Sequence, residues 1–164
     1  MKMKLVCIMA LACSAAFAQT GDAARGKAVF EGKGQCFTCH RINGNGSRTG
    51  PDLTDIGNLR KQEQLEKSIL DPDAEIDRQN RTYRVVTSTG ETISGRLLNM
   101  DAFSIQLLDS KERLRSFTKS NLKEWAFVEK SPMPSFKDKL NAQELADVVS
   151  YLVSLKGIEE RIAP

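Results

Sequence analysis

The chain has 164 residues, of which 40% are hydrophobic and 27% are charged, a balance typical of a globular protein with one or two small domains. Its formal net charge is +3 at pH 7, and loss of the predicted signal segment would remove two lysines and leave it close to neutral. This balance excludes a basic protein built to bind nucleic acid or an anionic membrane surface.

Residues 1–18 have the pattern of a secretory signal peptide. Lys2 and Lys4 give a positive start, residues 5–12 are almost wholly apolar, and Ala16-Phe17-Ala18 is a small-x-small cleavage sequence. The apolar run is too short to span a bilayer. We therefore expect cleavage near Ala18 and a periplasmic or secreted protein. Lipid anchoring at Cys13 is an alternative, although Ala10 is a poor match to the first position of a lipoprotein box.

The candidate functional motif is Cys36-Phe37-Thr38-Cys39-His40. A Cys-x-x-Cys-His run is the attachment sequence of c-type haem, in which both thiols form thioethers and the histidine binds the iron. After signal removal only Cys36 and Cys39 remain, and His40 is the sole histidine. A structural zinc site needs about four Cys or His ligands. A thioredoxin-like pair needs a preceding strand, and a plain disulfide leaves the adjacent histidine unexplained.

The flanking segments predict short helices and a turning loop. Residues 22–31 read as a helix capped by Asp22, and residues 60–70 as a second helix that ends before Pro72. Between them, several glycines mark a loop that turns repeatedly. At its end, the carbonyl of Pro51 is a candidate acceptor for the Nδ1–H of His40, with a plain Gly-Pro turn as the alternative.

Residues 80–129 change to a strand pattern. β-Branched and aromatic residues partly alternate, and turn residues separate the runs. Five short antiparallel strands are expected, forming a meander or a small SH3-like or Sm-like barrel. The expected fold is therefore mainly α: a helical haem domain at 19–79 and 130–164, with a β-rich insert at 80–129.

The second axial ligand of the iron is predicted to be Met133. Only Met100 and Met133 remain after signal removal, and Pro132 and Pro134 stiffen the backbone around Met133. Met100 lies between two predicted strands, where packing explains it. A final helix follows, with Asn141 and Glu144 as a capping box. Coordination by His40 and Met133 favours electron transfer over oxygen chemistry.

These features together resemble class I c-type cytochromes. The matching residues are Gly26 and Phe30 in the first helix, the haem motif, Gly50-Pro51-Asp52-Leu53, Ser131-Pro132-Met133-Pro134, and Tyr151 in the last helix. The resemblance implies covalent haem c, a crossing of the first and last helices near Tyr151, and an electron-carrying role. The chain also resembles bacterial haem-binding domains that have a β-rich insert before the Met ligand; small family members lack this insert.

The sequence therefore predicts a non-enzymatic, periplasmic monohaem carrier of single electrons, acting between a dehydrogenase or quinol-oxidising complex and a downstream acceptor. Its partners would be redox proteins, with no nucleic acid and no membrane span. An alternative function is a haem-based redox or ligand-sensing module whose β insert binds a partner protein. An enzyme with an open iron site is a weaker alternative, because no further histidine is available for base catalysis.

Overall fold

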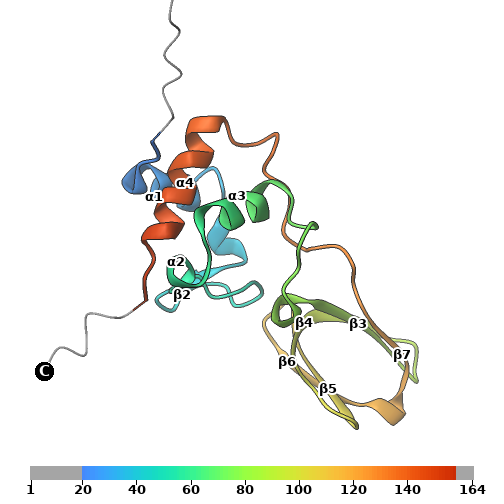
Figure 1. Ribbon diagram of the computed structural model, residues 1–164. Helices are drawn as coiled ribbons and strands as arrows, with labels where there is room; N and C mark the ends of the chain where they lie inside the picture. Colours follow the sequence, from blue (N-terminus) through green and yellow to red (C-terminus); the bar gives the residue numbers. More distant parts are fainter. Residues whose placement is uncertain (1–19, 158–164) are drawn as a thin grey trace, which may run out of the picture.

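The computed structural model describes residues 20–157, which form a helical body and an antiparallel sheet joined by two connecting segments (Figure 1). The predicted signal segment, its cleavage point at Ala18 and the alternative anchor at Cys13 lie outside the described residues. Within residues 20–157, no helix is long and apolar enough to cross a bilayer.

Two crossing helices build the helical body. The first, α1, spans Ala23–Glu31. Asp22 is its N-cap, and the Asp22 carboxylate accepts from the Arg25 amide at 2.7 Å. The last, α4, spans Ala142–Ser154 and starts with the predicted Asn141–Glu144 capping box. A Cβ added at Gly26 would lie 1.9 Å from the Asp147 carbonyl oxygen, so only glycine allows this approach. The predicted crossing is confirmed, and the rings of Phe30 and Tyr151 lie 5.6 Å apart.

An ion pair between a buried aspartate and an exposed arginine joins the two crossing helices. The Asp147 side chain is only 4% exposed, and its Oδ2 lies 2.8 Å from Nε of Arg25. The other oxygen, Oδ1, accepts from the Asp22 amide at 2.7 Å and from Gln143 at 2.9 Å. The hydrogen bond from Arg25 is the main cause that holds the pKa of Asp147 well below its usual range. No pattern in the sequence predicts this contact.

Shorter elements complete the helical body. A 3₁₀ turn η1 (Cys36–Thr38) follows α1, then the strand pair β1 (Arg41–Ile42) and β2 (Asn45–Gly46), the short helix α2 (Ile56–Leu59) and the helix α3 (Gln62–Leu70). Leu65 and Ile69 of α3 join a core with Phe30 of α1 and with Val149 and Leu152 of α4. The segment predicted as a helix at 60–70 is thus confirmed, whereas the sequence analysis missed α2.

Five antiparallel strands form the sheet, with β7 returning to pair with β3. The strands are β3 (Thr82–Thr87), β4 (Thr92–Met100), β5 (Ser104–Asp109), β6 (Leu114–Thr118) and β7 (Leu122–Phe127), in the order β6-β5-β4-β3-β7. Two 3₁₀ turns, η2 (Arg78–Asn80) and η3 (Lys119–Asn121), precede β3 and β7. All five strands lie inside the range predicted for the insert, and Figure 1 shows them curling around a common interior.

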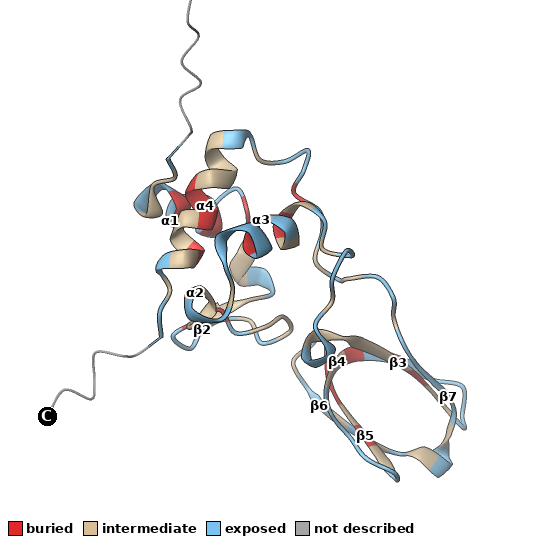
Figure 2. Cartoon of the chain, viewed as in Figure 1, coloured by how far each residue is buried: buried red, intermediate tan, exposed pale blue. Residues whose placement is uncertain are grey.

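The sheet has its own small core, separate from that of the helices. Val85, Ile93, Ile105 and Leu107 are buried together on its inner face, and Figure 2 shows buried segments both there and where α1, α3 and α4 meet. Strand and helix residues are comparable in amount. The expectation of a mainly α chain is therefore not supported, because the insert contributes a sizeable antiparallel sheet beside the helices.

Hydrogen bonds tie the two connecting segments to each other and the sheet to the haem-motif loop. The Ser131 amide donates to Oδ1 of Asp73 at 2.7 Å, which links the outgoing and returning segments. At the other contact, the Arg48 amide donates to Oε1 of Glu112 at 3.1 Å, and Nη2 of Arg96 donates to the Arg48 carbonyl at 3.0 Å. The connecting segments are thus tied to each other, and the sheet is attached to the haem-motif loop around Arg48.

Candidate haem-binding site

The Cys-x-x-Cys-His motif forms one tight turn. The Cys36 carbonyl accepts from the amides of Cys39 and His40, at 3.2 and 2.9 Å. Gln35 enters the turn in the left-handed region with φ of 49°. Cys36 is half-buried, Cys39 is exposed, and both are free thiols. The turn therefore presents the two thiols and the imidazole from three positions of one short segment.

The pKa of Cys36 bears on whether the cysteine pair serves haem attachment or thioredoxin-like redox chemistry. Burial, followed by the neighbouring Cys39, raises the pKa of the Cys36 thiol to about 11. A dithiol redox site requires the opposite, a cysteine with a lowered pKa that is a thiolate near neutral pH. The raised pKa of Cys36 thus argues against a thioredoxin-like role and agrees with thiols that serve as attachment points.

His40 is oriented by a single contact from the loop that follows. Its Nδ1 lies 2.9 Å from the carbonyl oxygen of Pro51, so the predicted contact is present. A carbonyl only accepts, so Nδ1 carries the proton and Nε2 keeps its lone pair. Burial lowers the pKa of His40, although the Pro51 contact acts in the opposite direction. His40 is therefore prepared as a neutral Nε2 ligand, while its binding to iron stays a prediction.

Two glycines allow the loop to lie close to the motif. A Cβ at Gly50 would lie 3.1 Å from both Cε1 and Nδ1 of His40. Gly46 has φ of +102°, and a Cβ there would lie 2.3 Å from the His40 carbonyl oxygen. The glycine pattern that predicts a turning loop is explained by this packing against His40.

Met133 lies in the segment between β7 and α4. It is half-buried and packs against the helical core, as Cys36 and Phe37 also do. Its amide donates to Oγ of Ser131 at 3.1 Å, and Oγ of Ser135 donates to the Leu70 carbonyl at 2.6 Å. These bonds fix the segment against the end of α3. The role of Met133 as the second axial ligand stays a prediction.

The other methionine lies elsewhere. Met100 ends β4, where it pairs with Ile105 of β5, and its side chain is 39% exposed. It belongs to the sheet rather than to the helical core that contacts Cys36 and Met133. The geometry therefore leaves Met133 as the methionine associated with the haem-motif half of the chain.

Sequence reasoning missed the polar contacts that join the haem-motif loop to the sheet. Arg48 forms an ion pair with Glu112 at 3.4 Å, and its carbonyl accepts from Arg96. Glu112 adopts a φ of 58° in the β5–β6 turn. Two residues of opposite charge this far apart in the sequence form no local pattern that would predict their contact. The only indication in the sequence is a basic residue, Arg48, in the glycine-rich loop after the haem motif.

The donor set fits haem c. Attachment needs two thiols close to a histidine with an available ring nitrogen, and the turn supplies Cys36, Cys39 and Nε2 of His40. A thioether ligand completes the iron's coordination in electron-transfer cytochromes, and Met133 lies on the same core. The aromatic rings of Phe30 and Phe37, 5.0 Å apart, add an apolar wall beside the turn.

Comparison with known proteins finds a family match that includes this site. The family model described as cytochrome c matches residues 23–94, from the start of α1 into β4. Members of that family bind covalently attached haem c with its iron. No curated protein matches the chain. The matched range includes the Cys36–His40 turn and Pro51, whereas Met133 and α4 lie beyond it.

Proposed function

Because residues 23–94 carry a class I cytochrome c domain, we propose that this protein is a periplasmic monohaem electron carrier. It takes single electrons from a dehydrogenase or a quinol-oxidising complex and passes them to a downstream acceptor. The observation that carries the proposal is the 2.9 Å contact between Nδ1 of His40 and the Pro51 carbonyl, which leaves Nε2 as a fixed ligand. The periplasmic location rests on the signal-like sequence of residues 1–18.

Each residue of the site has a separate role in this proposal. Bound haem c supplies one-electron exchange at its iron. Cys36 and Cys39 would hold the group covalently, His40 and Met133 would supply the two ligands of its iron, and the Pro51 carbonyl would increase the basicity of the His40 ring. Neutral thioether ligation stabilises the reduced state and raises the reduction potential. With both axial positions filled, the protein transfers electrons without binding substrate at the metal.

The proposal is tested by the visible and near-infrared spectra of the oxidised and reduced protein, with Met133→Ala compared with Met100→Ala. Both variants shorten a methionine, but only one of them lies on the helical core. We expect the weak far-red sulfur-to-iron band of the oxidised protein to vanish in Met133→Ala and to persist in Met100→Ala. A high-spin wild-type spectrum that neither substitution changes would overturn the carrier proposal.

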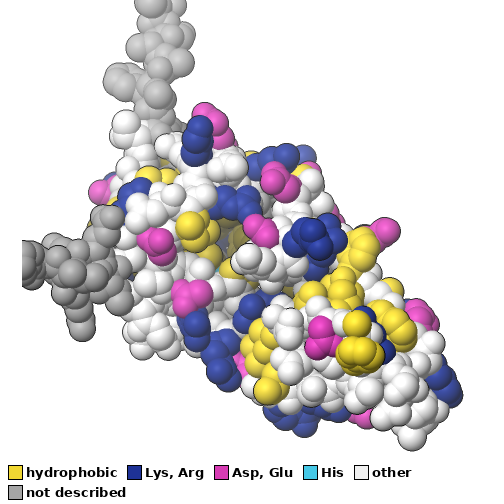
Figure 3. Space-filling model, turned by 60° about the horizontal axis from the view of Figure 1, so that its bottom comes forward, with side chains coloured by type: hydrophobic (Ala, Val, Ile, Leu, Met, Phe, Trp, Pro, Cys, Tyr) yellow, Lys and Arg dark blue, Asp and Glu magenta, His cyan; other side chains and the backbone are white. Residues whose placement is uncertain are grey.

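A second candidate function, partner binding by the sheet, is favoured by where apolar side chains are exposed. Seven large hydrophobic residues are exposed among the described residues, and all except Leu59 belong to the segment that forms the sheet. Phe103 is 80% exposed and Leu114 is 64% exposed. Figure 3 shows hydrophobic side chains gathered on the face of the sheet turned to the viewer. Such clustering is typical of protein interaction surfaces.

Deleting residues 81–127 separates the two candidates. A binding role predicts that the deleted protein keeps its haem spectrum but is reduced more slowly by its physiological donor. Equal reduction rates for the deleted and full chains would exclude a binding role and leave the carrier function with the helical body alone. As a control for folding, the deleted chain should retain the helical circular dichroism of the full chain.

A further inference from the structure

The arginines of the described residues divide into two groups by their partners. Of the ten between residues 20 and 157, seven form an ion pair with a carboxylate. The three others are Arg78, Arg81 and Arg96, for which the same residues offer no carboxylate within salt-bridge distance. Because guanidinium groups rarely lack an acceptor unless exposed to water, the location of these three is informative.

All three unpaired arginines line one cavity. It has a volume of about 520 Å³ and lies between η2 and the strands β3 and β4. None of its lining residues is an acid. Its wall combines three guanidinium groups with an apolar surface. The apolar surface comes from Tyr83, Leu97 and Met100. A site that offers several positive charges beside an apolar wall matches an organic anion.

Arg96 is the least satisfied of the three. Its Nη2 donates to the Arg48 carbonyl at 3.0 Å, but its Nε is buried and has no acceptor within the described part of the chain. Burial lowers the pKa of Arg96, and the nearby cations Arg41 and Arg48 lower it further. A buried donor without an acceptor costs stability, and among the three arginines Arg96 is the one with such a donor.

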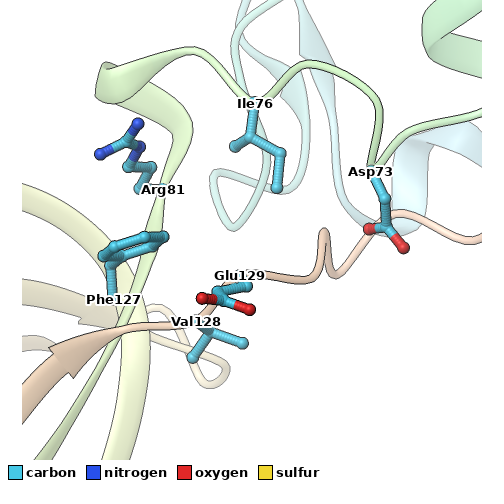
Figure 4. A pocket seen from close by; sticks show the side chains of 6 residues that line it. All are labelled: Asp73, Ile76, Arg81, Phe127, Val128 and Glu129. Atoms are coloured by element: carbon cyan, nitrogen blue, oxygen red, sulfur yellow. The ribbon is translucent and has the colours of Figure 1, made fainter.

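The adjoining cavity provides an internal contrast. It measures about 180 Å³ and includes Arg81, but Asp73 and Glu129 also line it. In Figure 4, Asp73 lies across this cavity from Arg81, whose guanidinium stacks over the ring of Phe127 at 4.8 Å. The acidic residues balance the charge there. The excess of positive charge is therefore confined to the larger cavity.

We propose that the Arg78–Arg81–Arg96 cavity binds the carboxylates of an organic anion. Hydrogen bonds from the guanidinium groups to carboxylates would balance the positive charge of a lining that has no acid, and Leu97 and Met100 would cover the apolar part of the ligand. Two sources have this chemistry. One is a free polycarboxylate, and the other is the pair of propionates of the protein's own haem, because Arg96 contacts the loop that follows His40. Only the second source rests on the proposed function.

The test compares Arg96→Gln with Arg84→Gln in the haem-loaded protein. Arg84 carries the same charge on the neighbouring strand, but it is paired with Glu124 and does not line the cavity. The probe is citrate, with sodium chloride at matched ionic strength as the control. A free-anion site predicts that citrate raises the Tm of the wild type and of Arg84→Gln. It also predicts that the Kd for citrate rises roughly tenfold in Arg96→Gln, as expected from losing a charged hydrogen bond.

The propionate source gives a different result. Citrate would then leave the Tm of the wild type and of both variants unchanged. Arg96→Gln would lower the reduction potential of the haem more than Arg84→Gln does, because removal of a cation beside the propionates favours the oxidised state. Absence of citrate binding together with equal potentials in the two variants would overturn the proposal. Failure of the carrier function alone would leave the citrate result unaffected.

Discussion

The helical body and the sheet differ in how their sequences encode them. The helical body joins residues far apart in the chain, such as Arg25 with Asp147, and it has glycine at close backbone approaches such as that of Gly26. Apart from the β3–β7 pair, the sheet pairs strands that are consecutive in the chain, and it buries mainly aliphatic side chains. A functional site in the first therefore depends on a few positions where long-range contacts meet, whereas the second depends mainly on the side chains of its inner face.

The sharpest test of this difference is to remove a buried side chain from the sheet alone. Ile105→Ala deletes a side chain with 0% exposure, and it should cost about 3 kcal/mol through lost burial and the cavity left behind. Trp125 on β7 is the only tryptophan, so its fluorescence reports the sheet. We expect its transition in urea to shift while the helical circular dichroism transition stays in place.

If both probes shift together after this substitution, the two regions unfold as one cooperative unit. The exposed Leu114→Ala is the matched control. It removes a comparable aliphatic side chain without opening a cavity and should leave both transitions close to those of the wild type.

The reciprocal change is made at the helix crossing. Gly26→Ala places a Cβ within 1.9 Å of the Asp147 carbonyl, which side-chain rotation cannot relieve, so α1 and α4 must separate. We expect a loss of about 2 kcal/mol, in the range of overpacked cores. Helical circular dichroism and haem absorbance should shift, with Trp125 fluorescence unchanged. Ala24→Ser on the exposed side of α1 is the control, and a stable Gly26→Ala would contradict the close crossing.

Acid should affect the two regions over different ranges, with a smaller effect than either substitution. Hydrogen bonds from Arg113 lower the pKa of Asp109 in β5 from 3.8 to about 2, and those from Arg25 lower the pKa of Asp147 further. A lowered folded pKa gives stability that is present above the unfolded value and is lost as pH falls towards the folded one. The sheet should therefore lose this contribution between about pH 4 and pH 2, and the helical body should continue to lose it below that range.

The measurement is the urea midpoint of each probe as a function of pH. Asp109→Asn should flatten the acid dependence of the Trp125 signal alone, and Asp147→Asn that of the helical signal alone. Unchanged slopes in both variants would mean that other carboxylates govern acid unfolding.

The smallest effect is expected at the contact between the two regions. Arg48→Gln removes the ion pair with Glu112. The side chains of Arg48 and Glu112 are 52% and 36% exposed. Exposed pairs contribute little, so Tm should fall by no more than roughly 3 °C. The spectrum of the haem should not change. A large separation of the two unfolding transitions in this variant would show that this pair, rather than the connecting segments, couples the regions.

Features formed by residues close together in the sequence could be predicted from it, whereas features formed by distant residues could not. The haem motif, the Asn141–Glu144 capping box and the strand runs are local patterns, and the structure places helices, turns and strands there. The Pro51 contact was accessible because a family-like loop links it to His40 over a short distance. The Arg25–Asp147 pair and the three-arginine cavity had no such signal, since their members come together only through the packing of separate elements.

The paired ends of the sheet have a consequence for the kinetics of folding. The Val128 amide donates to the Thr82 carbonyl at 2.8 Å, so the chain enters and leaves the sheet at adjacent points. Once the local hairpins have formed, the entropy lost in closing the chain between α3 and Met133 is that of two short connecting segments rather than of the whole insert. Early formation of the sheet would therefore bring Met133 to the helical core faster than an unstructured insert of the same length, and slow formation would delay this packing.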